Sequence, residues 1–207
     1  MALPIRHPQA LLFALLLATS SLHAQPEIDY ERMLSDVEEA ASLVDTGLDE
    51  LSTALEANIG SQAEIDARFE KLTQMLDQVD GKIGESSDNW SMVEQAIEQA
   101  DSERQAMLDK YTQTRDADYQ EYADAWAEMK QRLIDVRQGL LDERTEMEGL
   151  KAELAQSRDK ITQLIKLQRA EAAAQKLEQV RDRLAAMNDT MRSLVESTRQ
   201  VQAGMPN

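Results

Sequence analysis

Apolar residues recur along most of the chain at alternating steps of four and three residues. The first series runs from Tyr30 to Leu55, and the same phase continues past polar Asn58 to Ile83 and on to Tyr111. A heptad repeat of this kind gives each helix a narrow apolar seam, which suits another helix and is too narrow to cover a sheet. The pattern therefore predicts an all-α protein built as an elongated coiled coil.

The phase of the seam shifts by one residue at two places. After the first shift the seam runs from Tyr122 to Leu164, with polar residues at Glu143 and Ser157, and the second shift falls within residues 169–175. Other polar residues on the seam either fix the register when buried or face solvent. They are Asn58, Gln62, Ser86, Arg104, Thr114 and Asp118. The last block is regular again, with apolar residues at Leu177, Val180, Leu184, Met187, Met191, Leu194 and Val201.

Two stretches contain residues that end helices. Gly60 can close one helix, and Ser61 with Glu64 can form a capping box for the next. The heptad phase is the same on both sides, so we expect a kink at 60–61. Residues 81–89 hold a denser cluster of Gly, Ser, Asp and Asn, and we place the chain reversal there.

The expected topology is a helical hairpin with a long second helix. Its segments are a first coiled-coil arm at 25–84, a turn at 85–89, a long coiled-coil helix at 90–203 and a C-terminal tail at 204–207. The alternative is an up-down-up three-helix bundle, in which the second half breaks near 139–149. The uninterrupted seam from Tyr122 to Leu164 favours the straight helix.

The distribution of proline supports long helices. The four prolines stand at positions 4, 8, 26 and 206, so residues 27–205 contain none. Helix interiors exclude proline because it lacks the N–H group and clashes with the preceding turn. The chain also has only seven glycines, and its abundance of Ala, Glu, Gln and Leu favours helix.

The N-terminal segment reads as a secretory signal peptide. Arg6 precedes an apolar run at residues 10–18, which is about half the roughly 20 residues that a membrane-spanning helix needs. A polar stretch then ends in small Ala24, so we expect cleavage between Ala24 and Gln25. The mature protein should be exported, to the periplasm of a bacterium or to the medium, with no integral membrane segment.

Charge and composition exclude several classes of function. The full chain has a net charge of −17, and without residues 1–24 it has 21 basic against 39 acidic residues, which disfavours nucleic acid as a partner. The histidines, His7 and His23, lie in the leader, and the chain has no cysteine. Thiol catalysis, imidazole bases and ordinary zinc or haem ligation are therefore excluded from the mature chain, and we expect no cofactor and no metal.

Few residues are candidates for a site. The acidic group Asp116, Asp118, Glu121 and Asp124 lacks the glycine turn of a calcium loop, so we interpret it as a solvated helix face. Tyr119 lies off the seam and is a candidate contact residue, because aromatic side chains are enriched in interfaces. Glycosylation motifs begin at Asn89 and Asn188, and they matter only in a host that glycosylates secreted proteins.

These features predict a binding protein without catalysis, because the seam accounts for almost every large apolar residue. We expect an exported coiled-coil scaffold, spacer or adaptor that pairs with itself as a homo-oligomer or with a protein of the cell envelope. The candidate interaction seam is the last block, Leu177, Val180, Leu184, Met187, Met191, Leu194 and Val201. The alternatives are an ATP-independent holding chaperone for exported clients and a helical-bundle sensor or ligand module.

Overall fold

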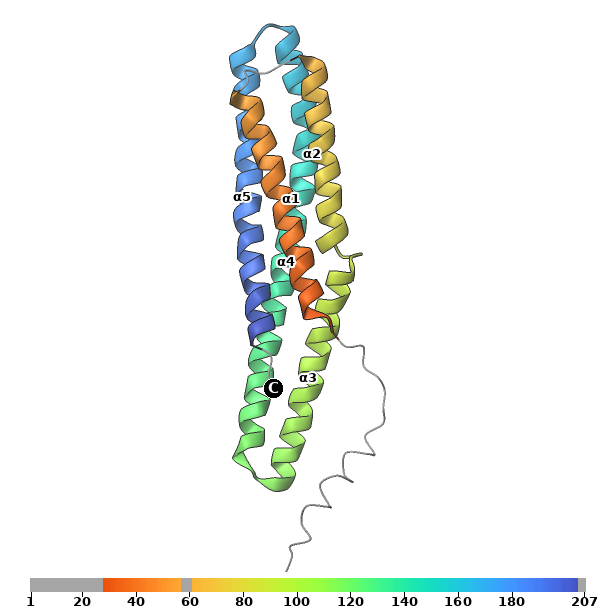
Figure 1. Cartoon of the computed structure of the whole chain (residues 1–207), viewed down its shortest axis with the longest axis vertical. Coiled ribbons are helices and arrows are strands. Elements are labelled where there is room, and N and C mark those ends of the chain that lie inside the picture. Colours follow the sequence, from red (N-terminus) through yellow and green to blue (C-terminus); the bar gives the residue numbers. More distant parts are fainter. Residues whose placement is uncertain (1–27, 57–60, 205–207) are drawn as a thin grey trace, which may run out of the picture.

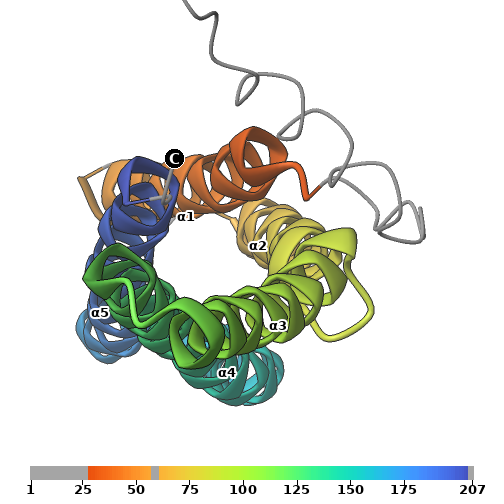
Figure 2. The ribbon, with the colours of Figure 1, turned by 90° about the horizontal axis from the view of Figure 1, so that it is seen from below.

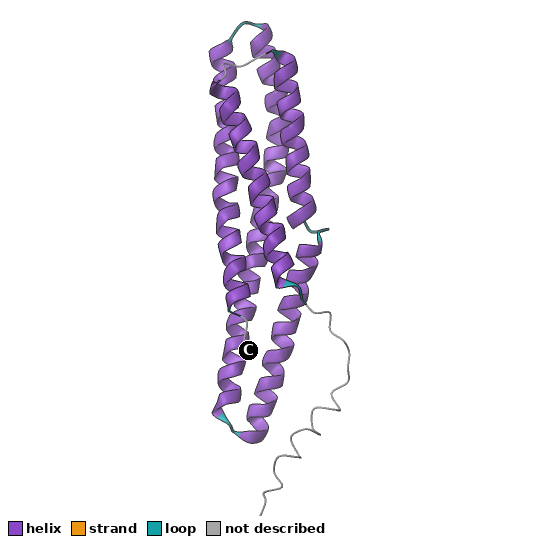
Figure 3. Ribbon diagram, viewed as in Figure 1, coloured by secondary structure: helices purple, strands orange, loops and turns teal. Residues whose placement is uncertain are grey.

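The computed structural model describes residues 28–56 and 61–204, and this part of the chain is all helical with no strand (Figure 3). The all-α class predicted from the heptad repeat is confirmed. The helices are α1 (Tyr30–Glu56), α2 (Gln62–Ile83), α3 (Asp88–Thr114), α4 (Ala117–Lys166) and α5 (Ala170–Ala203). The predicted leader at 1–24, its Ala24–Gln25 cleavage site, Asn58 and Gly60 lie outside the described residues, as do the last three residues of the tail.

The helices form an elongated bundle. Helix α1 runs from the middle of the molecule to one end, α2 returns beside it, and α3 continues in the same direction to the opposite end (Figure 1). Helix α4 then runs back along the whole length, and α5 returns to the middle. The molecule therefore has a four-helix body, in which α1, α2, α4 and α5 surround a common centre, and a two-helix extension of α3 and α4 (Figures 1 and 2).

The first chain reversal lies between α1 and α2, and the expected reversal at 85–89 is wrong. Helix α4 pairs in one antiparallel line with α2 and then with α3, through Lys151–Asp77 at 2.7 Å and Arg137–Glu94 at 3.4 Å. The short interruption at 84–87 therefore separates α2 from α3 without changing the direction of the chain. The heptad phase could not distinguish a kink from a reversal. A connection of suitable length between two antiparallel helices leaves the phase of the repeat unchanged.

The long helix expected at 90–203 is three helices with two reversals. The chain reverses at Arg115–Asp116 and again at residues 167–169. Arg115 and Gln168 adopt left-handed backbone conformations there, with φ of 60° and 57°. Both reversals coincide with the phase shifts of the seam. The alternative break near 139–149 is also wrong, because α4 passes through it as a single helix of 50 residues.

The apolar seam of α5 lies in the core of the chain's own bundle. Its seven predicted interaction residues are between 0% and 4% exposed. Helix α1 covers this face, with its Asp45 accepting hydrogen bonds from Asn188 at 2.7 Å and Arg192 at 3.0 Å. The prediction that this seam is an assembly surface is therefore wrong. It assumed that the first arm was a single extended element, whereas that arm folds into α1 and α2 and places α1 against α5.

Candidate interaction surface at the tip of the α3–α4 hairpin

The α3–α4 extension projects beyond the four-helix body. Near the end of α5, Arg132 of α4 donates a hydrogen bond to the carbonyl of Gln200 at 3.3 Å. The part of α4 that precedes residue 130 therefore lies past the end of α5, beside the second half of α3 (Figure 1). Lys130 and Asp101 form an ion pair at 2.6 Å across its base, and this contact holds the pKa of Asp101 below its ordinary value. We call residues 101–130 the tip hairpin.

Local hydrogen bonds fix the turn of the tip hairpin. The backbone N–H of Arg115 donates to the carbonyl of Tyr111 at 2.7 Å and closes α3. The N–H of Asp116 donates to the Thr114 hydroxyl at 3.2 Å, and the Asp116 carboxylate accepts from the N–H of Asp118 at 3.2 Å. Asp116 thus caps the first turn of α4. A two-residue connection of this kind is typical of an antiparallel helical hairpin.

Aromatic residues are concentrated in the tip hairpin. The chain has eight Phe, Trp and Tyr residues, and four of them lie within residues 111–126. The Lys110 ammonium lies 5.7 Å from the centre of the Tyr119 ring, and the Arg115 guanidinium lies 5.8 Å from that of Tyr111. Exposed cation–π contacts of this kind stabilise by about 0.5–1 kcal/mol and hold the rings in place.

Tyr122 lies on the outside of the tip hairpin, although the heptad pattern placed it on the seam. Its exposed fraction is 47%, whereas the adjacent Ala123 is fully buried. The smaller Ala123 side chain fills the space between α3 and α4, so the seam runs one residue away from its predicted position. Trp126 keeps its predicted place and is partly buried against the core. Tyr119, the predicted contact residue, is half-buried.

The surface around these rings is acidic. Residues 101–130 contain eight acidic and four basic side chains. Asp118, Glu121, Tyr122 and Ala125 line a shallow hollow of about 280 Å³. The four carboxylates that were predicted to form a solvated helix face are all exposed. Within residues 28–56 and 61–204, no group of three or more acidic or histidine side chains is placed to hold a metal ion.

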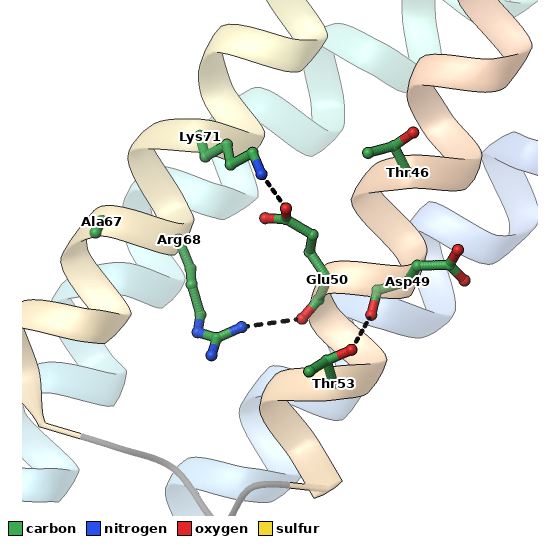
Figure 4. A pocket seen from close by; sticks show the side chains of 7 residues that line it. All are labelled: Thr46, Asp49, Glu50, Thr53, Ala67, Arg68 and Lys71. Carbon is green, nitrogen blue, oxygen red and sulfur yellow. Dashed lines mark hydrogen bonds and ion pairs between the residues drawn. The ribbon is translucent and has the colours of Figure 1, made fainter.

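Another hollow lies between α1 and α2 and has a volume of about 550 Å³ (Figure 4). Its polar groups are bonded to one another. Glu50 pairs with Lys71, while Arg68 donates to the Glu50 carbonyl at 3.3 Å and Thr53 to the Asp49 carbonyl at 2.9 Å. The two contacts of Glu50 hold α1 against α2, so we assign this groove to helix packing.

The two glycosylation motifs are inaccessible in the folded chain. Asn89 is 0% exposed and Asn188 is 3% exposed. Each side-chain amide donates a hydrogen bond inside the bundle, so neither can accept a sugar without local unfolding. Sequence reasoning missed the structural role of both asparagines, since their positions between helices depend on the topology.

Comparison with known proteins gives no match: no protein-family model, no curated protein and no solved structure is similar to this chain. None of the helices in the described part of the chain is both long enough and apolar enough to cross a membrane. Function is therefore argued from the geometry of the bundle and its tip hairpin.

Proposed function

We propose that this protein is an exported helical adaptor or spacer that binds a protein of the cell envelope through its tip hairpin. The observation that carries the proposal is the exposed ring of Tyr122 on a two-helix extension that the body leaves uncovered. Export is inferred from the predicted leader, with the periplasm as the destination and secretion as the alternative. Binding alone accounts for the proposed role, and no catalytic step is part of it.

The distribution of exposed apolar side chains favours the tip hairpin as the contact surface. The body buries the apolar seam of α5 against its own helices and covers its surface with ion pairs. Among the described residues, the exposed large apolar side chains are Tyr122 and Leu167. Aromatic residues at the centre of a contact often carry most of the binding energy. Tyr122, on the same hairpin as Tyr111 and Tyr119, fits that role.

The length of the molecule supports a spacer role. Tyr122 and Leu167 lie near opposite ends of α4, and 50 helical residues span about 75 Å. The body stabilises most of this distance as a bundle. A partner bound at the tip hairpin would therefore be held far from the turn between α4 and α5.

The charge of the tip hairpin indicates the chemistry of its partner. The excess of carboxylates around Tyr122 favours a surface with an apolar pocket for the ring and a basic rim, because complementary charges speed association and disfavour wrong partners. The same carboxylates disfavour an anionic lipid surface or a nucleic acid.

Site-specific photocrosslinking tests this function. A photoreactive phenylalanine analogue replaces Tyr122 in the full-length protein, which is expressed in its native host with the leader intact. We expect one discrete cross-linked envelope protein, and the same analogue at Leu167 should not capture it. No product from position 122, or identical products from both positions, would show that the tip hairpin is not the binding surface.

A pair of variants separates binding from folding. Tyr122→Ser should weaken partner capture and leave the thermal midpoint close to wild type, because the ring is largely outside the core. Leu167→Ser is the matched control at the other end of α4 and should leave capture unchanged. Equal losses in both variants would contradict the assignment.

A further inference from the structure

A carboxylic acid lies in the centre of the bundle with no hydrogen-bond partner in the described structure. Glu143 of α4 is 0% exposed, and neither of its carboxylate oxygens has a donor within reach. Burying an ionised carboxylate without a partner is costly, so such a group takes up a proton instead. Burial, together with the nearby charges of Glu146 and Asp142, raises the pKa of Glu143 to about 8.

Asn89 lies at the same level of the bundle as Glu143. In the chain it falls between Glu85, which pairs with Arg144, and Glu94, which pairs with Arg137 at 3.4 Å. Because α3 and α4 are antiparallel, Asn89 faces the stretch 137–144 of α4. Its burial places the side chain on the inner face of α3.

Asn188 of α5 faces the same part of α4. Glu146 pairs with Arg183 at 3.1 Å, and a Cβ atom added to Gly139 would lie 3.0 Å from the Leu194 side chain. Asn188 falls between Arg183 and Leu194, so it faces the stretch 139–146 of α4. The two asparagines therefore flank Glu143, but they are not at one level of the bundle. Asn89 bonds to Met33 and Asn188 to Asp45, and these two residues are 12 positions, or about 18 Å, apart along α1.

The hydrogen bonds of the two asparagines fix which atom of each amide lacks a partner. The Asn89 amide nitrogen donates to the carbonyl of Met33 at 3.3 Å, and the Asn188 amide nitrogen donates to the Asp45 carboxylate at 2.7 Å. Turning either amide over would place its oxygen against another acceptor. Both Oδ1 atoms are left buried without a donor, as are both Glu143 oxygens. These four buried acceptor atoms have no donor among the described residues, and a proton on Glu143 adds one.

The cationic side chains on the helices around Glu143 are paired with other carboxylates near the surface. Asp142 and Glu146 on α4 and Asp189 on α5 add negative charge close by, which disfavours a further charge on Glu143. The ion pairs are Arg32 with Asp36 and Asp88, Lys82 with Asp36 and Glu39, Arg137 with Glu94, Arg144 with Glu85 and Glu148, Lys151 with Asp77 and Asp80, Arg183 with Glu146 and Glu153, and Arg192 with Asp45.

We propose that Glu143 is a buried proton-binding site: it is a neutral acid in the folded bundle, and its deprotonation loosens the bundle at the break between α2 and α3. Protonation removes the buried charge, whose desolvation is costly. Loss of the proton leaves a negative charge with no donor among the described residues, and the bundle must admit water to solvate it. The site lies beside this break, since the next residue, Arg144, pairs with Glu85.

The sign of the pH effect follows from the direction of the pKa shift. Glu143 has an ordinary pKa of 4.5 when unfolded and a pKa of about 8 when folded, so the folded chain holds an extra proton between these values. Stability therefore falls as pH rises through this window and levels off above it. The effect is opposite to that of a carboxylate held by an ion pair.

Urea unfolding across pH tests the proposal on the full chain. We expect the wild-type midpoint to fall between pH 5 and pH 8.5, and Glu143→Gln, which keeps the shape without the charge, to lack this component and to exceed wild type at the upper end. Glu171→Gln, which removes an exposed carboxylate at the start of α5, should keep the wild-type pH profile. A Glu143→Gln profile parallel to wild type would overturn the proposal.

Infrared spectroscopy provides a readout that does not depend on variant stability. The folded wild-type protein at pH 6.5 should show the carbonyl band of one protonated carboxylic acid that disappears near pH 9 and is missing from Glu143→Gln. Absence of that band at pH 6.5 refutes a neutral Glu143. The urea midpoint at pH 9 gives a further check. If sodium, potassium or calcium chloride raises it to the value at pH 6.5 and choline chloride does not, the buried carboxylate binds a metal cation, and the proton site is overturned.

Discussion

Truncation of one leucine in α5 tests whether this helix completes the core of its own chain. Leu184 is 1% exposed, and Leu184→Ala removes three carbon atoms from the bundle. At about 0.8 kcal/mol per buried methylene, the transfer loss is about 2.4 kcal/mol. The unfilled cavity raises the expected loss of unfolding free energy to about 3–5 kcal/mol.

Urea denaturation followed by circular dichroism measures this loss. With a slope of about 2 kcal/mol per M, the midpoint should fall by about 1.5–2.5 M. Leu167→Ala makes the same chemical change at a side chain that is 67% exposed, and its effect should stay within about 0.5 kcal/mol. The wild-type midpoint should not change over a hundredfold range of protein concentration.

Two results would refute the reasoning. If Leu184→Ala and Leu167→Ala unfold at the same urea concentration, the seam of α5 is not in the core of the monomer. If the midpoint rises with protein concentration, a second chain covers that seam, because association stabilises by mass action. Either result would restore the original prediction of an assembly surface on α5.

Other changes give further predictions. Gly81→Ala should raise the unfolding free energy by about 0.5–1 kcal/mol in thermal or urea unfolding, because the added methyl group meets open space on a helix. Gly84→Ala should lower the unfolding free energy, because the new Cβ would lie 2.6 Å from the Asp80 carbonyl oxygen. If Gly84→Ala proved more stable than Gly81→Ala, the placement of the break after α2 would be contradicted. Gln168→Gly should stabilise by about 1 kcal/mol, because glycine removes the cost of the left-handed conformation at the turn between α4 and α5. An unchanged melting midpoint for Gln168→Gly would contradict that turn geometry.

The heptad repeat predicted the helices and much of the core, but it did not predict their order in space. The straight course of α4 followed from the unbroken seam between Tyr122 and Leu164. The two phase shifts fell at real reversals, near Arg115 and Gln168, because the set of positions that faces the core changes after a turn. They were interpreted as irregularities of one helix, since neither Arg nor Gln is a typical residue for a left-handed helix end.

The candidate sites were only partly accessible to sequence reasoning. Tyr119 was singled out because it lay off the seam, whereas exposed Tyr122 was assigned to the core by the same periodicity. Glu143 was recognised as a polar seam residue, but its lack of a partner depends on which helices surround it. Asn89 and Asn188 are 99 residues apart in the chain, and only the folded topology makes both face the part of α4 that holds Glu143.

A shortened chain tests most directly whether the tip hairpin binds the partner. Removal of residues 108–114 and 117–123 deletes one heptad from each helix, keeps the Arg115–Asp116 turn and preserves the register of α3 against α4. The shortened hairpin ends about 10 Å closer to the body and lacks Tyr111, Tyr119 and Tyr122. We predict that this chain keeps a cooperative helical unfolding transition and loses capture of the envelope protein that cross-links at position 122. Wild-type capture by a folded, shortened chain would contradict the central claim and place the binding surface on the four-helix body.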